Sequence, residues 1–200
     1  MWRIGLTGSI ATGKSTVLKA FADLGVPVLS ADEAVADLYA GEAVAPVEAA
    51  FPGVTRNGMI DRTLLSQKLG ADPSGFKRLE ALVHPLVRAR IAQFMDEAEA
   101  AGHELAVVEV PLLFESGYDY GFYAVAVTWV DDAIQRQRAL ARPGMTVEKL
   151  DTIIARQMPQ AEKKARATYL FDTGMRQDKT VDMVSALVAA IRAKGPKNES

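Results

Sequence analysis

The chain has 200 residues, 49% apolar and 24% charged, a balance that is ordinary for a globular protein with a sizeable core. The formal net charge of −2 and the lack of a strongly basic stretch argue against nucleic acid as a partner, because such binding depends on clustered Lys and Arg. The absence of cysteine excludes disulfides and thiol nucleophiles. No apolar window approaches the ~20 residues of a membrane span, so we expect a soluble, cytoplasmic protein.

Short runs rich in valine and isoleucine alternate with longer segments of helical period. Strands are predicted at residues 2–7, 26–30, 105–110, 124–130 and 169–172. Helices are predicted at residues 14–24, 32–39, 85–101, 131–140, 147–157 and 180–193. This alternation is typical of βαβ units, so we predict an α/β protein with a doubly wound, mainly parallel five-stranded sheet.

A phosphate-binding motif lies between the first strand and the first helix. Residues 8–16, Gly-Ser-Ile-Ala-Thr-Gly-Lys-Ser-Thr, fit the pattern G-x-x-x-x-G-K-[ST]. Its glycines let backbone N–H groups face a phosphate, Lys14 neutralises the β- and γ-phosphates, and the Ser15 hydroxyl reaches Mg²⁺. The predicted ATP contacts are Gly8, Ala11, Thr12, Gly13, Lys14, Ser15 and Thr16. The alternative interpretation is a glycine-rich turn with a surface lysine.

A carboxylate follows the second strand. Asp32 is predicted at the carboxyl edge of the parallel sheet, where open α/β sheets bind ligands. There it would accept a hydrogen bond from an acceptor hydroxyl and hold it in line for phosphoryl transfer. In the alternative interpretation, Ser30 and Glu33 form a capping box, and Asp32 only favours the helix dipole.

Four segments together resemble the dephospho-CoA kinase family, in the same order and at similar spacing. They are residues 8–16, Ser30-Ala31-Asp32, His84-Pro85 and the segment Val-Pro-Leu-Leu-Phe-Glu at residues 110–115. The resemblance implies a kinase that uses ATP and Mg²⁺ to phosphorylate the 3′-hydroxyl of dephospho-CoA. It also implies a P-loop kinase core at residues 1–31, 102–130 and 158–193, a helical substrate-side insertion at 32–101, a lid at 131–157 and a tail at 194–200.

The resemblance also assigns catalytic roles. Asp32 matches the aspartate that positions the acceptor, and Lys14 and Arg138 are expected to act with it on the transferred phosphate. Arg138 and Arg142 match lid arginines that close over the triphosphate, where a guanidinium stabilises charge on the phosphoryl oxygens. A solvated face carrying Arg136, Arg138 and Arg142 is the alternative.

Three further residues match the side that receives dephospho-CoA: Arg62, His84 and Glu115. Each also has a structural interpretation. His84 before Pro85 would end a loop at the start of a helix, while Arg62 and Glu115 would form an ion pair or separate surface groups. Glu109 is a weaker candidate for an acid that reaches toward Mg²⁺.

The chain departs from the common family pattern at three places. Ser30 stands where the family often has aspartate, so a second carboxylate near the acceptor is in doubt. Ala11 and Thr12 replace the usual Gly-Ser inside the loop, which should change its stiffness more than its phosphate contacts. Thr173 replaces a common asparagine, which weakens an adenine-loop assignment.

Two rival functions remain open at this point. One is another small-metabolite or nucleoside monophosphate kinase with the same core. The other is a regulatory protein that binds ATP without transferring phosphate. The sequence lacks the motif Asn-Lys-x-Asp that reads guanine, which argues against a GTPase. It does not indicate an oligomeric state.

Overall fold

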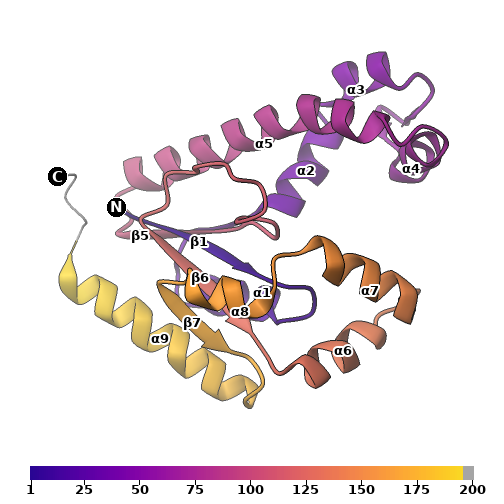
Figure 1. Cartoon of the computed structure of the whole chain (residues 1–200). Helices are drawn as coiled ribbons and strands as arrows, with labels where there is room; N and C mark the ends of the chain where they lie inside the picture. The colour runs from indigo at the N-terminus through magenta and orange to yellow at the C-terminus, as the bar shows by residue number, and fades with distance from the viewer. Residues whose placement is uncertain (196–200) are drawn as a thin grey trace. The chain divides into compact units, whose positions relative to one another are not determined.

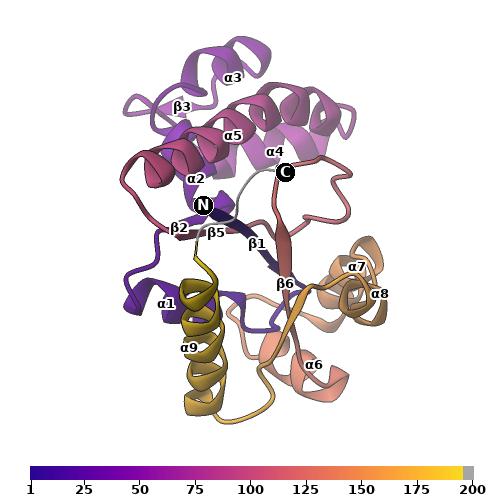
Figure 2. The same cartoon turned by 90° about the vertical axis from the view of Figure 1, so that its left-hand side faces the viewer.

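The computed structural model describes residues 1–195 and contains a five-stranded sheet (Figures 1 and 2). Its strands are β1 (Trp2–Gly8), β2 (Val28–Ser30), β5 (Leu105–Glu109), β6 (Ala124–Trp129) and β7 (Tyr169–Asp172). Their order in the sheet is β2-β5-β1-β6-β7, and β1 runs parallel to both β5 and β6. The predicted α/β fold and all five predicted strands are confirmed.

Strand β1 occupies the middle of the sheet because it pairs with β5 on one side and β6 on the other. Its last five residues are buried, and so is every residue of β5, as the valine-rich run at 105–110 predicts for a strand covered on both faces. The register aligns Gly8 with Thr128. Since β1, β5, β6 and β7 run parallel, the residues that follow these strands gather at one edge.

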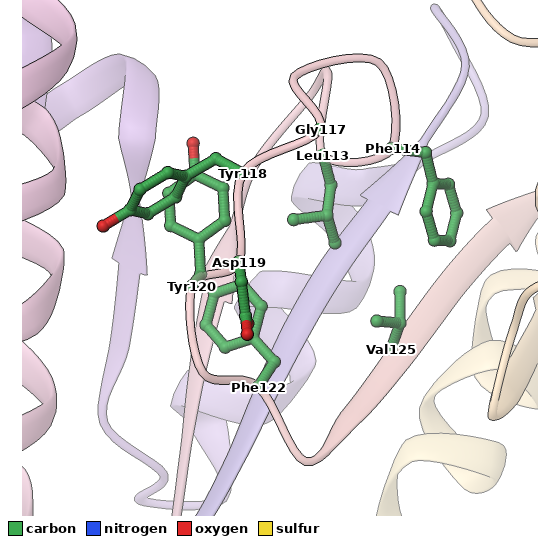
Figure 3. A pocket seen from close by; sticks show the side chains of 8 residues that line it. All are labelled: Leu113, Phe114, Gly117, Tyr118, Asp119, Tyr120, Phe122 and Val125. Carbon is green, nitrogen blue, oxygen red and sulfur yellow. The ribbon is translucent and has the colours of Figure 1, made fainter.

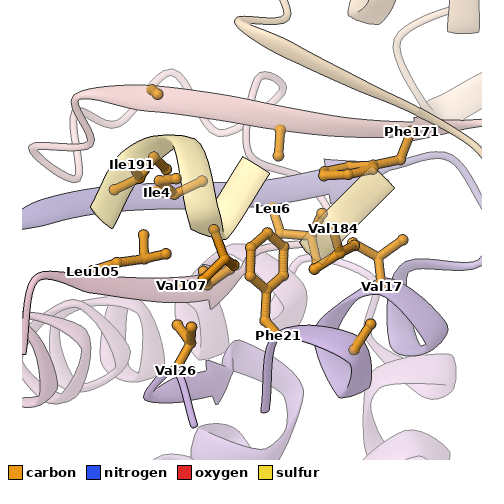
Figure 4. Packing of buried hydrophobic residues seen from close by; sticks show 14 residues of the cluster. Ile4, Leu6, Val17, Phe21, Val26, Leu105, Val107, Phe171, Val184 and Ile191 are labelled. Atoms are coloured by element: carbon orange, nitrogen blue, oxygen red, sulfur yellow. The ribbon is translucent and has the colours of Figure 1, made fainter. Parts of the chain in front are cut away.

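One face of the sheet is covered by α1 (Lys14–Asp23) and α9 (Gln177–Lys194), which pack against each other. Figure 4 shows the apolar core between these helices and the strands. The Phe21 ring from α1 meets the Phe171 ring from β7 edge to face, with centroids 6.1 Å apart. Helix α9 contributes Val184, Val188 and Ile191 to this core, and all three are buried.

Three shorter helices lie between β6 and β7. They are α6 (Asp132–Leu140), α7 (Val147–Arg156) and α8 (Gln160–Ala165). The first two agree with the predicted lid helices to within a residue at each end, whereas α8 was not predicted. Six residues are too few to establish a helical period, and Pro159 at its N-cap was the only sequence signal for a helix start there.

The chain divides into two compact units, of which the second, Ser30–Phe94, interrupts the first. The second unit holds α2 (Ala31–Tyr39), α3 (Val44–Ala50), the hairpin strands β3 (Thr55–Arg56) and β4 (Met59–Ile60), α4 (Arg62–Ala71) and most of α5 (Gly75–Ala100). The hairpin turns at Asn57 and Gly58, which both have positive φ, as an Asn-Gly turn requires.

Helix α5 begins ten residues before the predicted start at residue 85, so Pro85 lies inside it. The prediction placed the boundary there because proline removes a backbone donor and disfavours helix in the preceding residue. Packing overrides that preference, since one stripe of buried side chains continues through the proline. Its members are Val83, Val87, Ile91 and Met95. The interpretation of His84 as the end of a loop is therefore wrong.

Two smaller observations complete the fold. Within residues 1–195, no helix is both long and apolar enough to cross a membrane. The predicted tail at 194–200 lies outside the described residues from residue 196 onward, while Lys194 is the last residue of α9.

We expect the replacement of Phe21 by Ala to lower the free energy of unfolding by about 3–5 kcal/mol, because the ring is fully buried and leaves a cavity. Urea denaturation followed by circular dichroism measures this change. Phe76→Ala is the matched control, since Phe76 is 51% exposed and its loss should cost within about 0.5 kcal/mol. Equal effects of the two substitutions would contradict the described core.

Candidate active site

Residues 9–13 connect β1, which ends at Gly8, to α1, and this is the strand-to-helix position that the phosphate-binding motif requires. Ala11 and Gly13 have φ of 59° and 83°, in the left-handed region. A Cβ on Gly8 would lie 2.2 Å from the Thr128 Oγ1 atom of β6, so only glycine fits there. The loop thus combines a close approach to β6 with two left-handed residues.

Buried threonines hold the loop from inside. The Thr12 hydroxyl donates to the Ser9 carbonyl at 2.8 Å, and its oxygen lies 2.8 Å from the Thr128 Oγ1 atom. Thr173, just after β7, donates from its hydroxyl to the Thr12 carbonyl at 2.9 Å. The Thr12 side chain is fully buried, so it serves the shape of the loop. Thr173 therefore has a structural role that the sequence did not reveal.

The Lys14 ammonium lies over this loop. Its Nζ atom donates to the Gly8 carbonyl at 3.0 Å and to the Ser9 carbonyl at 3.2 Å. Ser15 is exposed and Thr16 half-buried in the first turn of α1, which carries no acidic residue. A helix N-terminus with N–H groups that lack intrahelical acceptors, one lysine and an accessible hydroxyl fits a phosphate with Mg²⁺.

The structure brings Arg138 to the loop. From α6, its guanidinium donates to the Thr173 carbonyl at 2.8 Å and to the Thr173 hydroxyl at 3.2 Å, and that hydroxyl contacts Thr12. Arg136 instead pairs with Asp151 of α7 at 2.7 Å. Arg142 is exposed just after α6 and makes no side-chain hydrogen bond or ion pair within residues 1–195. The three arginines therefore do not form one common face.

In the second unit, Asp32 lies in the first turn of α2 and is exposed. Ser30 is the N-cap residue of this helix, but its side chain makes no capping hydrogen bond, so the proposed capping box with Glu33 is not formed. The Asp32 carboxylate has no hydrogen bond or ion pair among the described residues. It is free to receive a hydroxyl donor.

The other two candidates of this unit also lie on helices. Arg62 is the first residue of α4, and its guanidinium lies 5.5 Å from the centre of the Tyr39 ring. Burial raises the pKa of Tyr39, while the charge of Arg62 opposes the rise. His84 is exposed within α5, next to Pro85. Arg62 is thus held by an aromatic ring, and the His84 imidazole stays open to solvent.

Glu115 pairs with Lys163 rather than with Arg62. Its Oε1 atom lies 2.8 Å from the Lys163 Nζ atom of α8 and accepts the Met158 N–H at 2.8 Å. The Lys163 side chain is 1% exposed, while the Glu115 Oε2 atom is buried without a hydrogen-bond partner. Burial alone would raise the pKa of Glu115, but the Lys163 ammonium and the Met158 N–H hold it below its ordinary value.

The loop between β5 and β6 surrounds a cavity of about 220 Å³ (Figure 3). Its walls are mainly apolar and aromatic side chains of this loop, including Leu113, Phe114, Tyr118, Tyr120 and Phe122. The Tyr120 and Phe122 rings stack with centroids 5.5 Å apart. A Cβ on Gly5 would lie 2.5 Å from the Phe122 ring, so glycine in β1 allows this ring to lie on the sheet.

Comparison with known proteins decides the family. The profile of dephospho-CoA kinases matches residues 2–178, nearly the whole described chain. The chain belongs to the dephospho-CoA kinase family. The resemblance predicted from the four motif segments is confirmed.

Individual relatives agree with this assignment to the dephospho-CoA kinases. A dephospho-CoA kinase of Rhodopseudomonas palustris is 55% identical over 170 residues, which cover 85% of each chain. A dephospho-CoA kinase of Rhizobium etli is 48% identical over 199 residues, covering 100% of this chain and 98% of the relative. The crystal structure of TT1252 from Thermus thermophilus has a TM-score of 0.78 at 31% identity and covers 94% of this chain and 96% of its own.

Sequence reasoning missed two glutamines at the loop of this dephospho-CoA kinase family member. Gln135 of α6 and Gln157, at the end of α7, bond to the backbone of Ile10. One signal was present in the sequence, because Gln135 lies four residues before Ala139 and so shares its helical stripe. A polar side chain in such a stripe needs a partner. Gln157 offered no comparable signal, since it follows the helix end.

Replacing Glu115 by Gln should lower the free energy of unfolding by about 1.5–3 kcal/mol at pH 7, because the buried Lys163 loses its charged partner. The pKa of Glu115 is lowered from 4.5 in the folded chain, so its stabilisation is complete above that value and is lost as the pH falls through the lower folded pKa. We therefore expect the difference between the two proteins to shrink below about pH 4.5.

Urea denaturation between about pH 7 and pH 3 checks this expectation. Glu104→Gln, at an exposed position, is the matched control and should change stability by less than about 0.5 kcal/mol at pH 7. A difference between Glu115→Gln and the unmodified protein that stays constant over the whole range would contradict the ion pair.

Proposed function

We propose that this protein transfers the γ-phosphate of ATP to the 3′-hydroxyl of dephospho-CoA, which gives CoA and ADP, the last step of coenzyme A biosynthesis. The observation that carries the proposal is the family match over residues 2–178. The loop at residues 8–16 supports it, because a kinase needs a cradle for the triphosphate of its donor.

On the nucleotide side, we assign the phosphate contacts to the backbone of residues 8–16 and to Lys14. Lys14 already points over the loop toward the Gly8 and Ser9 carbonyls, and it would exchange these neutral acceptors for phosphate oxygens. Ser15 would hold Mg²⁺ together with the nucleotide. When bound, this ion neutralises charge on the phosphates.

On the acceptor side, we assign to Asp32 the orientation of the 3′-hydroxyl. Its exposed and unpaired carboxylate, in the first turn of α2, supports this role. Phosphoryl transfer passes through a loose transition state, so the carboxylate has to orient the hydroxyl more than it has to remove its proton early.

We further propose that Arg62, His84 and Glu115 contact dephospho-CoA. Arg62 offers a charged fork for its phosphates, and the exposed imidazole of His84 offers a donor or an acceptor. Glu115 is the most constrained of the three, since Lys163 and Met158 occupy one of its oxygens and only Oε2 lacks a partner. A contact with substrate would therefore use Oε2 and would require this buried atom to become accessible.

We propose that Arg138 and Arg142 contact the triphosphate of ATP. The role of Arg138 is supported by its position: it bonds to Thr173, which in turn bonds to Thr12 of the loop. The guanidinium would then lie close to the negative charge that develops on the transferred phosphate. Arg142 is exposed beyond α6, so it would reach the nucleotide only when this segment closes. We place the reaction in the cytoplasm and propose no macromolecular partner.

The test of the proposed function is ADP release by the purified protein with Mg-ATP and dephospho-CoA. Adenosine, AMP, shikimate and a sample without acceptor are the matched controls, and mass spectrometry identifies the phosphorylated product. We expect release that depends on dephospho-CoA, with CoA as the product. Release with another acceptor would indicate a different small-metabolite kinase, and nucleotide binding without release would indicate a regulatory protein.

Two substitutions separate the roles at the site. Lys14→Ala should abolish both tight ATP binding and transfer, because the segment at residues 8–16 loses its only charged side chain. Asp32→Asn should keep the affinity for ATP and lower kcat by roughly 100-fold or more, since the amide cannot accept the hydroxyl proton. Calorimetry with ADP and steady-state kinetics measure the two effects. Near-normal turnover by Asp32→Asn would show that this carboxylate is not catalytic.

A further inference from the structure

Side chains from the helices after β6 bond to Ile10 in the phosphate loop. Gln135 of α6 donates from its Nε2 atom to the Ile10 carbonyl at 2.8 Å, and Gln157 accepts the Ile10 N–H at its Oε1 atom at 2.9 Å. Both backbone groups of one residue are thereby bonded to side chains far along the chain. Gln135 is only 4% exposed.

The donor and acceptor in each of these two hydrogen bonds are determined by the backbone groups of Ile10. The Ile10 carbonyl can only accept and its N–H can only donate, so Gln135 must present its amide nitrogen and Gln157 its amide oxygen. The remaining oxygen of Gln135 lies 3.2 Å from the Gln160 Nε2 atom, which also donates to Asp132 at 2.7 Å. Gln135 is thus oriented at both ends of its amide.

Apolar packing acts at the same place. Ala11 belongs to a small buried cluster with Ala139 of α6 and Leu150 of α7, and Ile10 packs against this cluster. Gln135 precedes Ala139 by four residues, so the hydrogen bond and the apolar contact come from one helix face. Hydrogen bonds and apolar packing therefore both hold the loop at Ile10 and Ala11.

Ala11, which follows Ile10, has a backbone conformation that the surrounding structure must stabilise. Ala11 has φ of 59°, and for a residue with a Cβ the left-handed region is disfavoured roughly tenfold. Such a conformation persists only where the surrounding structure determines it from several sides. Here Ile10 is bonded on one side of Ala11, and on the other the Thr12 hydroxyl donates to Ser9.

We propose that Gln135 and Gln157 are positioning residues that hold the loop in its nucleotide-binding shape by keeping Ala11 left-handed through Ile10. The proposal rests on the nucleotide site of the proposed function but not on the identity of the acceptor. It also assigns α6 and α7 to the nucleotide site, because both helices contact the loop, so that closure would involve only the residues between these two helices, including Arg142. Neither glutamine touches the reacting atoms in this role.

The test uses Gln135→Met, which keeps the length of the side chain and removes the amide. Isothermal titration calorimetry with Mg-ADP should show an affinity roughly three- to tenfold weaker than that of the unmodified protein. Amide hydrogen exchange of the nucleotide-free protein should be faster in the segment that contains residues 8–13. In kinetics, KM for ATP should rise while KM for the acceptor stays unchanged.

Gln137→Met is the matched control, because the same substitution falls on the same helix at an exposed position. It should leave affinity and exchange unchanged. A second substitution, Gln157→Met, removes the other bond to Ile10 and should have the same effects as Gln135→Met, which keeps the proposal testable if one variant fails to fold.

A suppressor separates this role from general stabilisation. Glycine adopts the left-handed region about as readily as any other, so in an Ala11→Gly background the loss caused by Gln135→Met should fall to roughly twofold. An equal loss in both backgrounds, or equal ADP affinity of Gln135→Met and Gln137→Met, would overturn the proposal. Failure of the proposed function would appear instead as normal ADP binding without phosphorylation of dephospho-CoA.

Discussion

The parallel pairing of β1 with β5 and β6 is the constraint on which the site depends. Because β1 lies between two strands, its end is fixed in register, and Gly8 comes to rest beside Thr128. No side chain fits between them, so the chain must turn at a glycine before it enters α1. The phosphate loop, the N-terminus of α1 and the threonines that line the loop all follow from that position.

Much of this could be predicted from the sequence because the signals were local. The five strands are apolar runs with clear limits, and the motif at residues 8–16 carries its own strand and helix context. Asp32 could be placed at a strand end by the same reasoning. These features depend on residues that are close in sequence, where spacing and side-chain type determine the structure.

The features that escaped prediction depend on residues far apart in sequence. Thr173 bonds to Thr12, and Gln157 to Ile10, across more than a hundred residues, and no spacing rule joins such pairs. At Pro85 a local signal was misleading instead. The proline predicted a helix boundary, but the buried side chains before and after it keep the helix continuous. Thr173 was noted only as a departure from a common asparagine, whereas the structure gives it a contact with Arg138.

Several buried polar groups of the first unit lie at the phosphate loop or in the helices after β6. Gln135, Lys163 and Thr173 are all nearly inaccessible to solvent, and each contacts another segment through a hydrogen bond or an ion pair. Burying such groups is costly unless they are paired, so their positions restrict how far these helices can shift without breaking contacts. The geometry therefore favours a loop that is shaped before the nucleotide arrives.

Crystal structures of the protein with and without Mg-ADP would test this preformed loop most directly. We expect the backbone of residues 8–13 to coincide in the two states, with Ala11 left-handed in both and with Ile10 still bonded to Gln135 and Gln157. Only the Lys14 ammonium should change partners, from the Gly8 and Ser9 carbonyls to phosphate oxygens. A loop that takes its shape only with nucleotide bound, or a nucleotide bound away from residues 8–16, would contradict this account.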